Sequence, residues 1–361
     1  PKPRSGKKQG HGRQKLTLIC WLRGTNRGVS FRARVAACVL LTKPAPCAPL
    51  IRFASGNEMD ATPNTFDKET FLEHRKNQEA SHFKRNTHGA GLVKSLLTVE
   101  VNTTELCNRK CVFCPRFDET VFPNRNLNMS LTGAELIAER LSAAQYAGKV
   151  SFSGFGENFL NPLFPEIVGI FREKLPHATI ECNTNGDKLT PELVSRVFEN
   201  GLDLLYINLY DGADQMAGFE RMVGPERAES VKYRMHWNDS DHGLILNNRS
   251  GRITWTGQDE SEVEQLRGKP CHYPFYKMFV DWNGDVLFCS NDWGREQVVG
   301  NLIQDSLEDV WFSKAMAKIR RRLAKGDRSQ APCNQCNVKG VLFGGESFRM
   351  LNEHYESGNN R

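Results

Sequence analysis

Between residues 97 and 210, short apolar segments alternate with longer segments in which apolar positions recur at helical spacing. The short segments are rich in β-branched residues, and we expect four buried strands: Leu97–Thr103, Lys149–Ser153, Ala178–Cys182 and Leu204–Tyr210. Capping patterns at Thr132 and Thr190 begin two of the longer segments, and the predicted helices cover 132–146, 165–174 and 190–200. Repeated strand–helix units indicate an α/β fold with a parallel sheet.

About six such units fit before Thr256, which is too few for a closed eight-unit barrel. The pattern changes at Gly268. Two alternating segments, Tyr276–Trp282 and Asp285–Cys289, flank Asn283-Gly284, and this arrangement predicts a β-hairpin. A helix is expected over about 306–324. The C-terminal part is therefore predicted to be a small α+β domain made of a hairpin and a helix.

Charge is unevenly distributed along the chain. Residues 1–57 contain twelve Lys or Arg and no acidic residue, so the remainder holds 36 basic and 42 acidic residues, a net charge of −6. Because this first stretch lacks periodicity and precedes the first methionine, Met59, we expect a disordered or non-native extension. A nucleic-acid-binding arm and a transit peptide are the alternatives. The predicted divisions are this extension (1–58), a helical lead-in (59–93), the strand–helix units (94–267), the small domain (268–340) and a tail (341–361).

The composition is typical of a globular protein outside the membrane. Hydrophobic residues make up 39% of the chain and charged residues 25%, and no apolar run approaches the ~20 residues that span a bilayer. The eleven cysteines occur without a clear secretory signal. Their clustering at ligand spacings favours metal binding in a reducing compartment, so we expect a cytoplasmic protein.

The first cysteine cluster follows the strand predicted at 97–103. It reads Cys107-Asn-Arg-Lys-Cys111-Val-Phe-Cys114, and three clustered thiols without a nearby fourth ligand leave one coordination position for a reacting group. This C-x3-C-x2-C spacing resembles the signature of the radical S-adenosylmethionine (radical SAM) enzymes. The resemblance implies that the three Cys hold a 4Fe-4S cluster whose fourth iron binds SAM, and that Phe113 packs near the adenine. A zinc site with a distant ligand, or thiols that bind nothing, are the alternatives.

The resemblance extends to the ends of later strands and implies an open, six-unit partial (β/α)6 TIM-like barrel. Gly154-Phe-Gly-Glu157 is similar to the family's Gly-Gly-Glu motif, so Gly156 and Glu157 are expected to bind the amino group of SAM. Polar residues on later strands are expected to contact its ribose and carboxylate, and an arginine to pair with a carboxylate of SAM or of substrate: Asn185, Asn208 and Arg249. Each of these also fits a turn or a satisfied polar position.

Cys182 stands at a strand end, apart from both cysteine clusters. A lone Cys there is usually a small buried apolar group. If its thiol faced the barrel interior, it could return a hydrogen atom to a substrate radical, as an epimerase requires. Several aromatic or histidine side chains could line the substrate pocket or could be structural: His236, Trp237, His242, Trp255 and His272.

The second cysteine cluster comprises Cys271, Cys289, Cys333 and Cys336, a complete set of four ligands that suits zinc or an iron–sulfur cluster. The arrangement resembles the SPASM or shorter twitch domain of radical SAM enzymes. Because no Cys follows Cys336, one auxiliary 4Fe-4S cluster is expected. Four protein ligands leave no free iron for substrate, which favours electron transfer as its task.

The resemblance therefore implies an enzyme that cleaves S-adenosyl-L-methionine reductively to a 5′-deoxyadenosyl radical and abstracts a hydrogen atom from a small-molecule substrate. Dehydrogenation or epimerisation of a sugar or aminocyclitol is expected, with an electron donor such as flavodoxin or ferredoxin. One alternative is a peptide- or protein-modifying maturase. The other is a non-enzymatic zinc-binding module that contacts nucleic acid, although the charge of −6 outside the first 57 residues does not favour nucleic acid.

Overall fold

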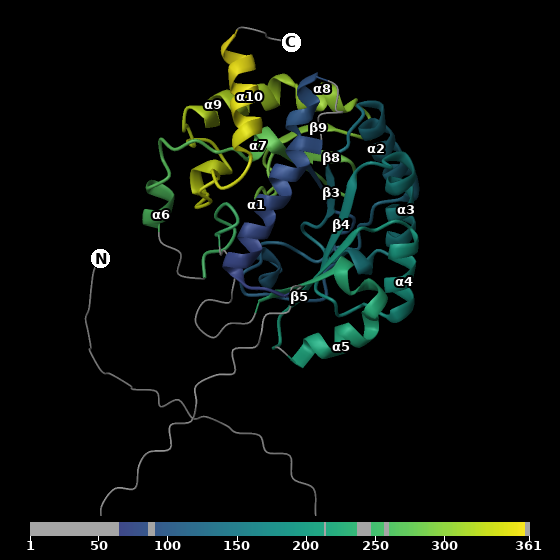
Figure 1. Cartoon of the computed structure of the whole chain (residues 1–361). Helices are drawn as coiled ribbons and strands as arrows, with labels where there is room; N and C mark the ends of the chain where they lie inside the picture. Colours follow the sequence, from purple (N-terminus) through teal and green to yellow (C-terminus); the bar gives the residue numbers. More distant parts are fainter. Residues whose placement is uncertain (1–64, 86–90, 213, 237–246, 256–259, 358–361) are drawn as a thin grey trace, which may run out of the picture. The chain divides into compact units, whose positions relative to one another are not determined.

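A computed structural model describes residues 65–357 except 86–90, 213, 237–246 and 256–259. The predicted extension 1–58 lies outside the described residues, as do Trp237 and His242. Nine strands form one sheet (Figure 1) in the order β1-β6-β5-β4-β3-β2-β7-β8-β9. Their bounds are β1 Thr65–Phe66, β2 Thr98–Val101, β3 Lys149–Phe152, β4 Thr179–Thr184, β5 Leu204–Leu209, β6 Val231–Met235, β7 Lys277–Val280, β8 Asp285–Leu287 and β9 Val298–Asn301.

The seven strands from β1 to β7 pair in parallel, and the sheet remains open in the part of the chain that the structure describes. The predicted α/β class and open partial barrel are thus confirmed. One detail differs from expectation. Only five strands of more than two residues, β2 to β6, lie before Thr256 among the described residues, and the sixth such strand, β7, pairs with β2. The first strand of the predicted hairpin therefore continues the parallel sheet, so the two cysteine-bearing regions share one sheet.

Helices that connect the strands cover one face of the sheet (Figure 1). They are α2 Leu131–Ala143, α3 Phe164–Lys174, α4 Pro191–Glu199 and α5 Asp214–Val223. Thr190 caps α4 as predicted, but Ser130 rather than Thr132 caps α2, where its hydroxyl accepts from the Gly133 backbone N–H. Phe152 of β3 packs edge-on against Phe164 and Phe171 of α3, at centroid distances of 5.3 and 5.2 Å. These contacts fasten the helix layer to the sheet.

The opposite face of the sheet is polar and is crossed by helix α1, Lys68–Arg85. Arg75 donates to both carboxylate oxygens of Glu181 on β4, at 2.9 and 3.0 Å, and Lys149 on β3 lies 3.3 Å from the same carboxylate. Successive strand residues point to opposite faces. Ile180 and Cys182 accordingly lie in the hydrophobic core on the helix side, whereas Glu181 faces α1.

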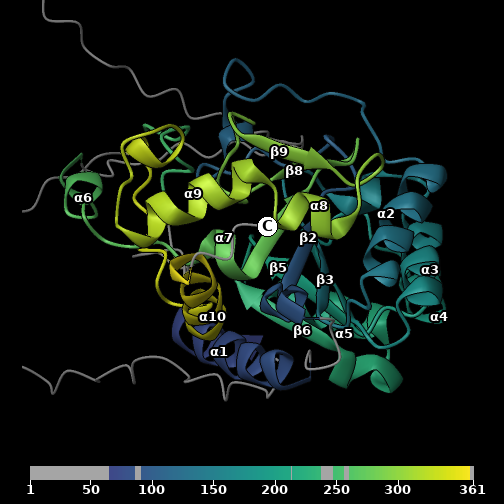
Figure 2. The same cartoon turned by 90° about the horizontal axis from the view of Figure 1, so that it is seen from above.

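The predicted hairpin is confirmed, because β7 and β8 pair antiparallel on either side of Gly284. β9 was not predicted and extends the hairpin by one more antiparallel strand. The helix expected over 306–324 is broken in two: Ser306 caps α8, Leu307–Trp311, and Ser313 caps α9, Lys314–Ala324. Viewed from above, α8 and α9 lie beside β8 and β9 (Figure 2).

Three further helices complete the described structure: α6 Glu260–Glu264, α7 Tyr273–Tyr276 and α10 Gly345–Glu356. Short 3-10 turns lie at η2 Gly91–Ser95, η3 Pro115–Phe117, η4 Asn158–Leu160, η5 Pro225–Ser230 and η6 Cys333–Gln335. The tail predicted from 341 thus contains α10, whose start is tied to α1 because the Gly344 N–H donates to Glu79 at 2.7 Å. Among the described residues, no helix has both the length and the apolar character needed to cross a membrane.

Candidate active site

The first cysteine cluster lies in an irregular loop beyond the carboxyl end of β2. Its backbone is held by side chains from outside the loop. Asn124 accepts from the Cys107 N–H at 2.9 Å and donates to the Cys107 carbonyl at 3.2 Å, and the Trp255 indole donates to the Val112 carbonyl at 2.6 Å. Burial and the two neighbouring thiols raise the pKa of Cys111 to about 12. The three thiols are therefore near enough to influence one another's pKa, and a bound cation would be needed to keep them deprotonated.

Gly154–Glu157 connects this loop to the ends of β3 and β4. A Cβ on Gly156 would collide with the Thr104 carbonyl oxygen and lie 2.9 Å from that of Leu106, so glycine is required for the loop to pack here. The buried Glu157 carboxylate accepts from the Thr184 hydroxyl and the Asn185 N–H, both at 2.7 Å. Burial raises its pKa. Gly156 and Glu157 thus hold the cysteine loop and the end of β4 together. That they also bind the amino group of SAM stays a prediction.

The two predicted asparagines also make contacts within the protein. The Asn185 amide donates to the side-chain oxygen of Asn108 at 3.0 Å, which links β4 to the cysteine loop. Asn208 donates to the Thr184 carbonyl at 3.0 Å, and its oxygen lies 2.9 Å from Nε2 of His236. Asn208 is therefore placed to orient His236.

Three rings gather beside the cysteine loop: Phe113, Tyr210 and His236. Their centroids are 5.0 to 6.0 Å apart, and no pair is tilted by more than 28°. Burial lowers the pKa of His236 well below its ordinary value, so its ring is neutral. Its Nδ1 is buried and has no hydrogen-bond partner among the residues that the structure describes. Of the other predicted wall residues, Trp255 contacts the cysteine loop and His272 stacks on Phe348.

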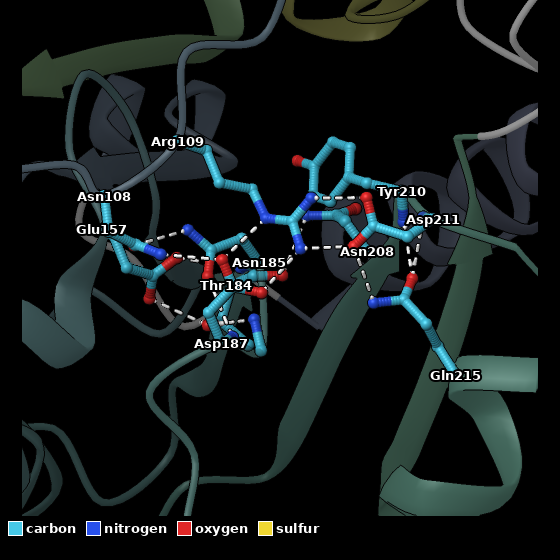
Figure 3. A network of polar contacts seen from close by, with 11 residues as sticks. Asn108, Arg109, Glu157, Thr184, Asn185, Asp187, Asn208, Tyr210, Asp211 and Gln215 are labelled. Atoms are coloured by element: carbon cyan, nitrogen blue, oxygen red, sulfur yellow. Dashed lines mark hydrogen bonds and ion pairs between the residues drawn. The ribbon is translucent and has the colours of Figure 1, made fainter. Parts of the chain in front are cut away.

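Arg109, which lies between the first two cysteines, was not identified from the sequence. Its guanidinium forms paired hydrogen bonds with two carboxylates, Asp187 after β4 and Asp211 after β5 (Figure 3). It also lies over the Tyr210 ring, 4.8 Å from the centroid. An arginine between motif cysteines carries no signal by itself, because its partners come from strands about 80 and 100 residues further along the chain.

Two cationic side chains, Arg116 and Arg249, lie near Cys114 and make the loop suitable for an anionic group. Both Arg116 and Arg249 lower the pKa of the Cys114 thiol, although burial outweighs them and raises it. Each has a buried nitrogen without a hydrogen-bond partner in the described part of the chain, Nη2 of Arg116 and Nε of Arg249. Three thiols next to unpaired guanidinium N–H groups fit an iron–sulfur cluster, and the unpaired Arg249 nitrogen fits a carboxylate of SAM or of substrate.

The second cysteine cluster surrounds one apolar pocket, into which Cys271, Cys289, Cys333 and Cys336 all open. Arg328 holds its rim together by donating to the carbonyls on either side, those of Lys269, Pro270, Val338 and Lys339, at 2.7 to 3.1 Å. Among the described residues, no group of three or more His, Cys, Asp or Glu converges as a single-ion site. The four thiols instead surround a volume, and this donor set fits a cluster.

Cys182 lies in the hydrophobic core and is fully buried. Its sulfur is 3.7 Å from the Asn158 amide nitrogen, and burial raises the pKa of its thiol well above the ordinary value. The condition for hydrogen-atom donation, a thiol that faces the barrel interior, is not met here. The geometry favours the alternative interpretation of a small buried group.

Comparisons with known proteins agree with both cysteine clusters. The Radical SAM superfamily model matches residues 101–237, and the SPASM model, an iron–sulfur cluster-binding domain, matches residues 271–337. The S-adenosyl-L-methionine-dependent 2-deoxy-scyllo-inosamine dehydrogenase of Niallia circulans is 29% identical over 246 residues, which is 67% of this chain and 92% of the relative.

Solved structures show the same similarity. The crystal structure of BtrN in complex with AdoMet and 2-DOIA aligns with a TM-score of 0.59 and 26% identity, covering 69% of this chain and 96% of that one. A structure of BtrN in an open conformation aligns with a TM-score of 0.51 and 24% identity, over 67% of this chain and 92% of that one, and supports the fold.

Proposed function

This chain is a radical SAM enzyme with a C-terminal SPASM domain, and from that premise we propose that it is a dehydrogenase that oxidises an alcohol of an aminocyclitol. The similarity to 2-deoxy-scyllo-inosamine dehydrogenase carries this proposal, because it extends over 246 residues and 92% of that relative. The buried position of Cys182 also favours dehydrogenation over epimerisation, since no hydrogen-atom donor is then assigned to the barrel interior.

The residues of the first site divide into ligands and supports. Cys107, Cys111 and Cys114 would hold the first 4Fe-4S cluster. When bound, this cluster and SAM supply the 5′-deoxyadenosyl radical that takes one hydrogen atom from the substrate carbon. Phe113, Tyr210 and His236 would bind the adenine, and the unpaired Nδ1 of His236 would accept from its amino group. Arg249 would pair with a carboxylate.

The second site would complete the oxidation. After loss of one hydrogen atom, conversion of an alcohol to a ketone releases one further electron and one proton. Cys271, Cys289, Cys333 and Cys336 would hold the auxiliary 4Fe-4S cluster that accepts this electron. A flavodoxin or ferredoxin would supply the electron for SAM cleavage. The thiol-rich sites suit the reducing cytoplasm.

Product analysis tests the proposal. Anaerobically reconstituted enzyme would be incubated with 2-deoxy-scyllo-inosamine, SAM and a strong reductant in deuterated water. Dehydrogenation predicts a product two mass units lighter, with one 5′-deoxyadenosine formed per turnover. A product of unchanged oxidation level that carries deuterium at a ring carbon would indicate epimerisation. SAM cleavage without any change in the cyclitol would reject this substrate class.

A further inference from the structure

We propose that Arg109, together with Asp187 and Asp211, is a positioning device that holds the Cys107–Cys111 segment in its cluster-binding conformation and keeps the reduction potential of the cluster low. This inference rests on the proposed function, because it requires a cluster on the first three thiols. It concerns residues between and around the ligands, which have no assigned role.

The contacts of Arg109 fix it in two directions. Its Nε and Nη2 donate to the two oxygens of Asp187 at 2.7 and 2.6 Å, and its Nη1 and Nη2 donate to those of Asp211 at 3.1 and 2.7 Å. Two such bidentate interactions require the planar guanidinium, whose fixed arrangement of N–H donors lysine lacks. Because the carboxylates follow different strands, β4 and β5, they fix both the position and the orientation of the guanidinium.

We call Arg109, Asp187 and Asp211 together the Arg109 clamp. The two carboxylates of this clamp are themselves held by neighbouring side chains. Gln215 of α5 accepts from the Asp211 N–H at 2.9 Å and donates to its carboxylate at 3.0 Å (Figure 3). Asn108 donates to Asp187 at 2.6 Å and accepts from Asn185 at 3.0 Å. Two consecutive loop residues, Asn108 and Arg109, are therefore bound to the same rigid strand ends. The loop has no helix or strand hydrogen bonding of its own between residues 107 and 111, so these side chains and Asn124, which binds the Cys107 backbone, hold it in place.

The charge of the clamp also has a consequence. One guanidinium faces two carboxylates, which leaves a net charge of −1. Arg109 is two residues from both Cys107 and Cys111, so this charge lies beside the ligands. A negative charge beside an iron–sulfur cluster disfavours the added electron and lowers its potential. Removing a carboxylate and removing the guanidinium should therefore shift the potential in opposite directions.

The test is a redox titration of the reconstituted protein, monitored by EPR. The signal that changes when SAM is added belongs to the first cluster, and its potential is the quantity compared. Asp211→Asn should shift the potential upward, and Arg109→Gln should shift it downward. Asp203→Asn is the matched control. Asp203 precedes the same strand, β5, at its other end and pairs with Arg172 at 2.5 Å. It should leave the potential unchanged.

Iron release to a chelator tests the positioning role. Loss of the charged hydrogen bonds in Arg109→Gln should speed release from the first cluster about tenfold or more, and Arg109→Lys should not restore the wild-type rate. Equal shifts in Asp211→Asn and Asp203→Asn, or shifts of one sign in Asp211→Asn and Arg109→Gln, would overturn the inference. So would wild-type iron retention in Arg109→Gln. None of these measurements needs the substrate, so failure of the aminocyclitol proposal would be seen separately.

Discussion

Asn208 fixes the tautomer of His236. The Asn208 amide nitrogen donates to the Thr184 carbonyl at 3.0 Å, which turns its oxygen toward Nε2 of His236, 2.9 Å away. An amide oxygen can only accept, so Nε2 must carry the proton. Because burial keeps the ring neutral, Nδ1 is left as an acceptor without a partner among the described residues, on a ring that stacks with Phe113 and Tyr210.

This acceptor predicts discrimination between purine bases. We expect S-adenosylhomocysteine to bind about ten- to a hundredfold more tightly than S-inosylhomocysteine, because a 6-oxo group would leave a buried acceptor opposed by another acceptor. His236→Phe should abolish most of the difference, and Asn208→Leu should reduce it. Calorimetric titration of the reconstituted enzyme measures both affinities. His272→Phe is the control, and undiminished discrimination in His236→Phe would remove Nδ1 from the adenine site.

Gly156→Ala should disrupt the packing of the Gly154–Glu157 turn against the backbone that leads into the cysteine loop. The added methyl group would meet backbone carbonyls of Thr104 and Leu106, which cannot move as a side-chain end would. We expect a loss of about 2–3 kcal/mol in the free energy of unfolding and the loss of about four irons per chain. Gly218→Ala in α5 is the matched control, because nothing lies within 4 Å of its added methyl. It should keep its iron and gain up to about 1 kcal/mol.

The ion pair between α1 and β4 predicts a pH dependence. Although burial opposes it, the attraction of Arg75 and Lys149 lowers the pKa of Glu181 below its ordinary value of 4.5. A lowered pKa in the folded state contributes stability above the unfolded pKa, and this contribution is lost as the carboxylate becomes protonated on acidification. The free energy of unfolding should therefore fall as the pH drops below 4.5.

Arg75→Met tests this account. It should destabilise the protein at pH 7 by about 3 kcal/mol, the lower end for a buried pair, because the Arg75 side chain is 23% exposed. Its stability should also depend less steeply on pH in the acid range. Urea unfolding of cluster-free protein, in which acid-labile clusters do not contribute, gives both quantities. An unchanged acid slope would show that Glu181 is not held by Arg75.

Cys182→Ala should retain wild-type turnover and an unchanged product. The thiol packs in the core on the helix side of β4, so we expect only a modest loss of stability, about 1 kcal/mol. Mass analysis of the product and a denaturation curve distinguish the two roles. A folded variant that forms 5′-deoxyadenosine but no product would return Cys182 to the mechanism.

The sequence was informative where the signal is local. Short apolar segments rich in β-branched residues identified β2, β3, β4 and β5, and both cysteine sets follow fixed spacings. The break between α8 and α9 was missed because Ser313 resembles an ordinary helical residue until its hydroxyl accepts from Met316. β9 was missed because its segment, Val298–Asn301, is short and irregular in pattern.

Functional contacts were predicted less well, because they join distant segments. Nothing near Arg109 indicates that carboxylates after two later strands will bind it. Arg328 likewise carries no motif, yet it donates to four carbonyls around the second cysteine set. Conversely, the polar residues expected to bind SAM were identified by position, and the structure shows Glu157 and Asn208 hydrogen-bonded to other groups of the protein.

The central claim is that three thiols present a cluster at which SAM is cleaved. The most direct measurement is 5′-deoxyadenosine formation by anaerobically reconstituted full-length protein with SAM and dithionite. We predict formation by the wild type and by the Cys333→Ala variant, and none by Cys107→Ala, Cys111→Ala or Cys114→Ala. Wild-type protein that carries its iron yet leaves SAM intact would contradict the account.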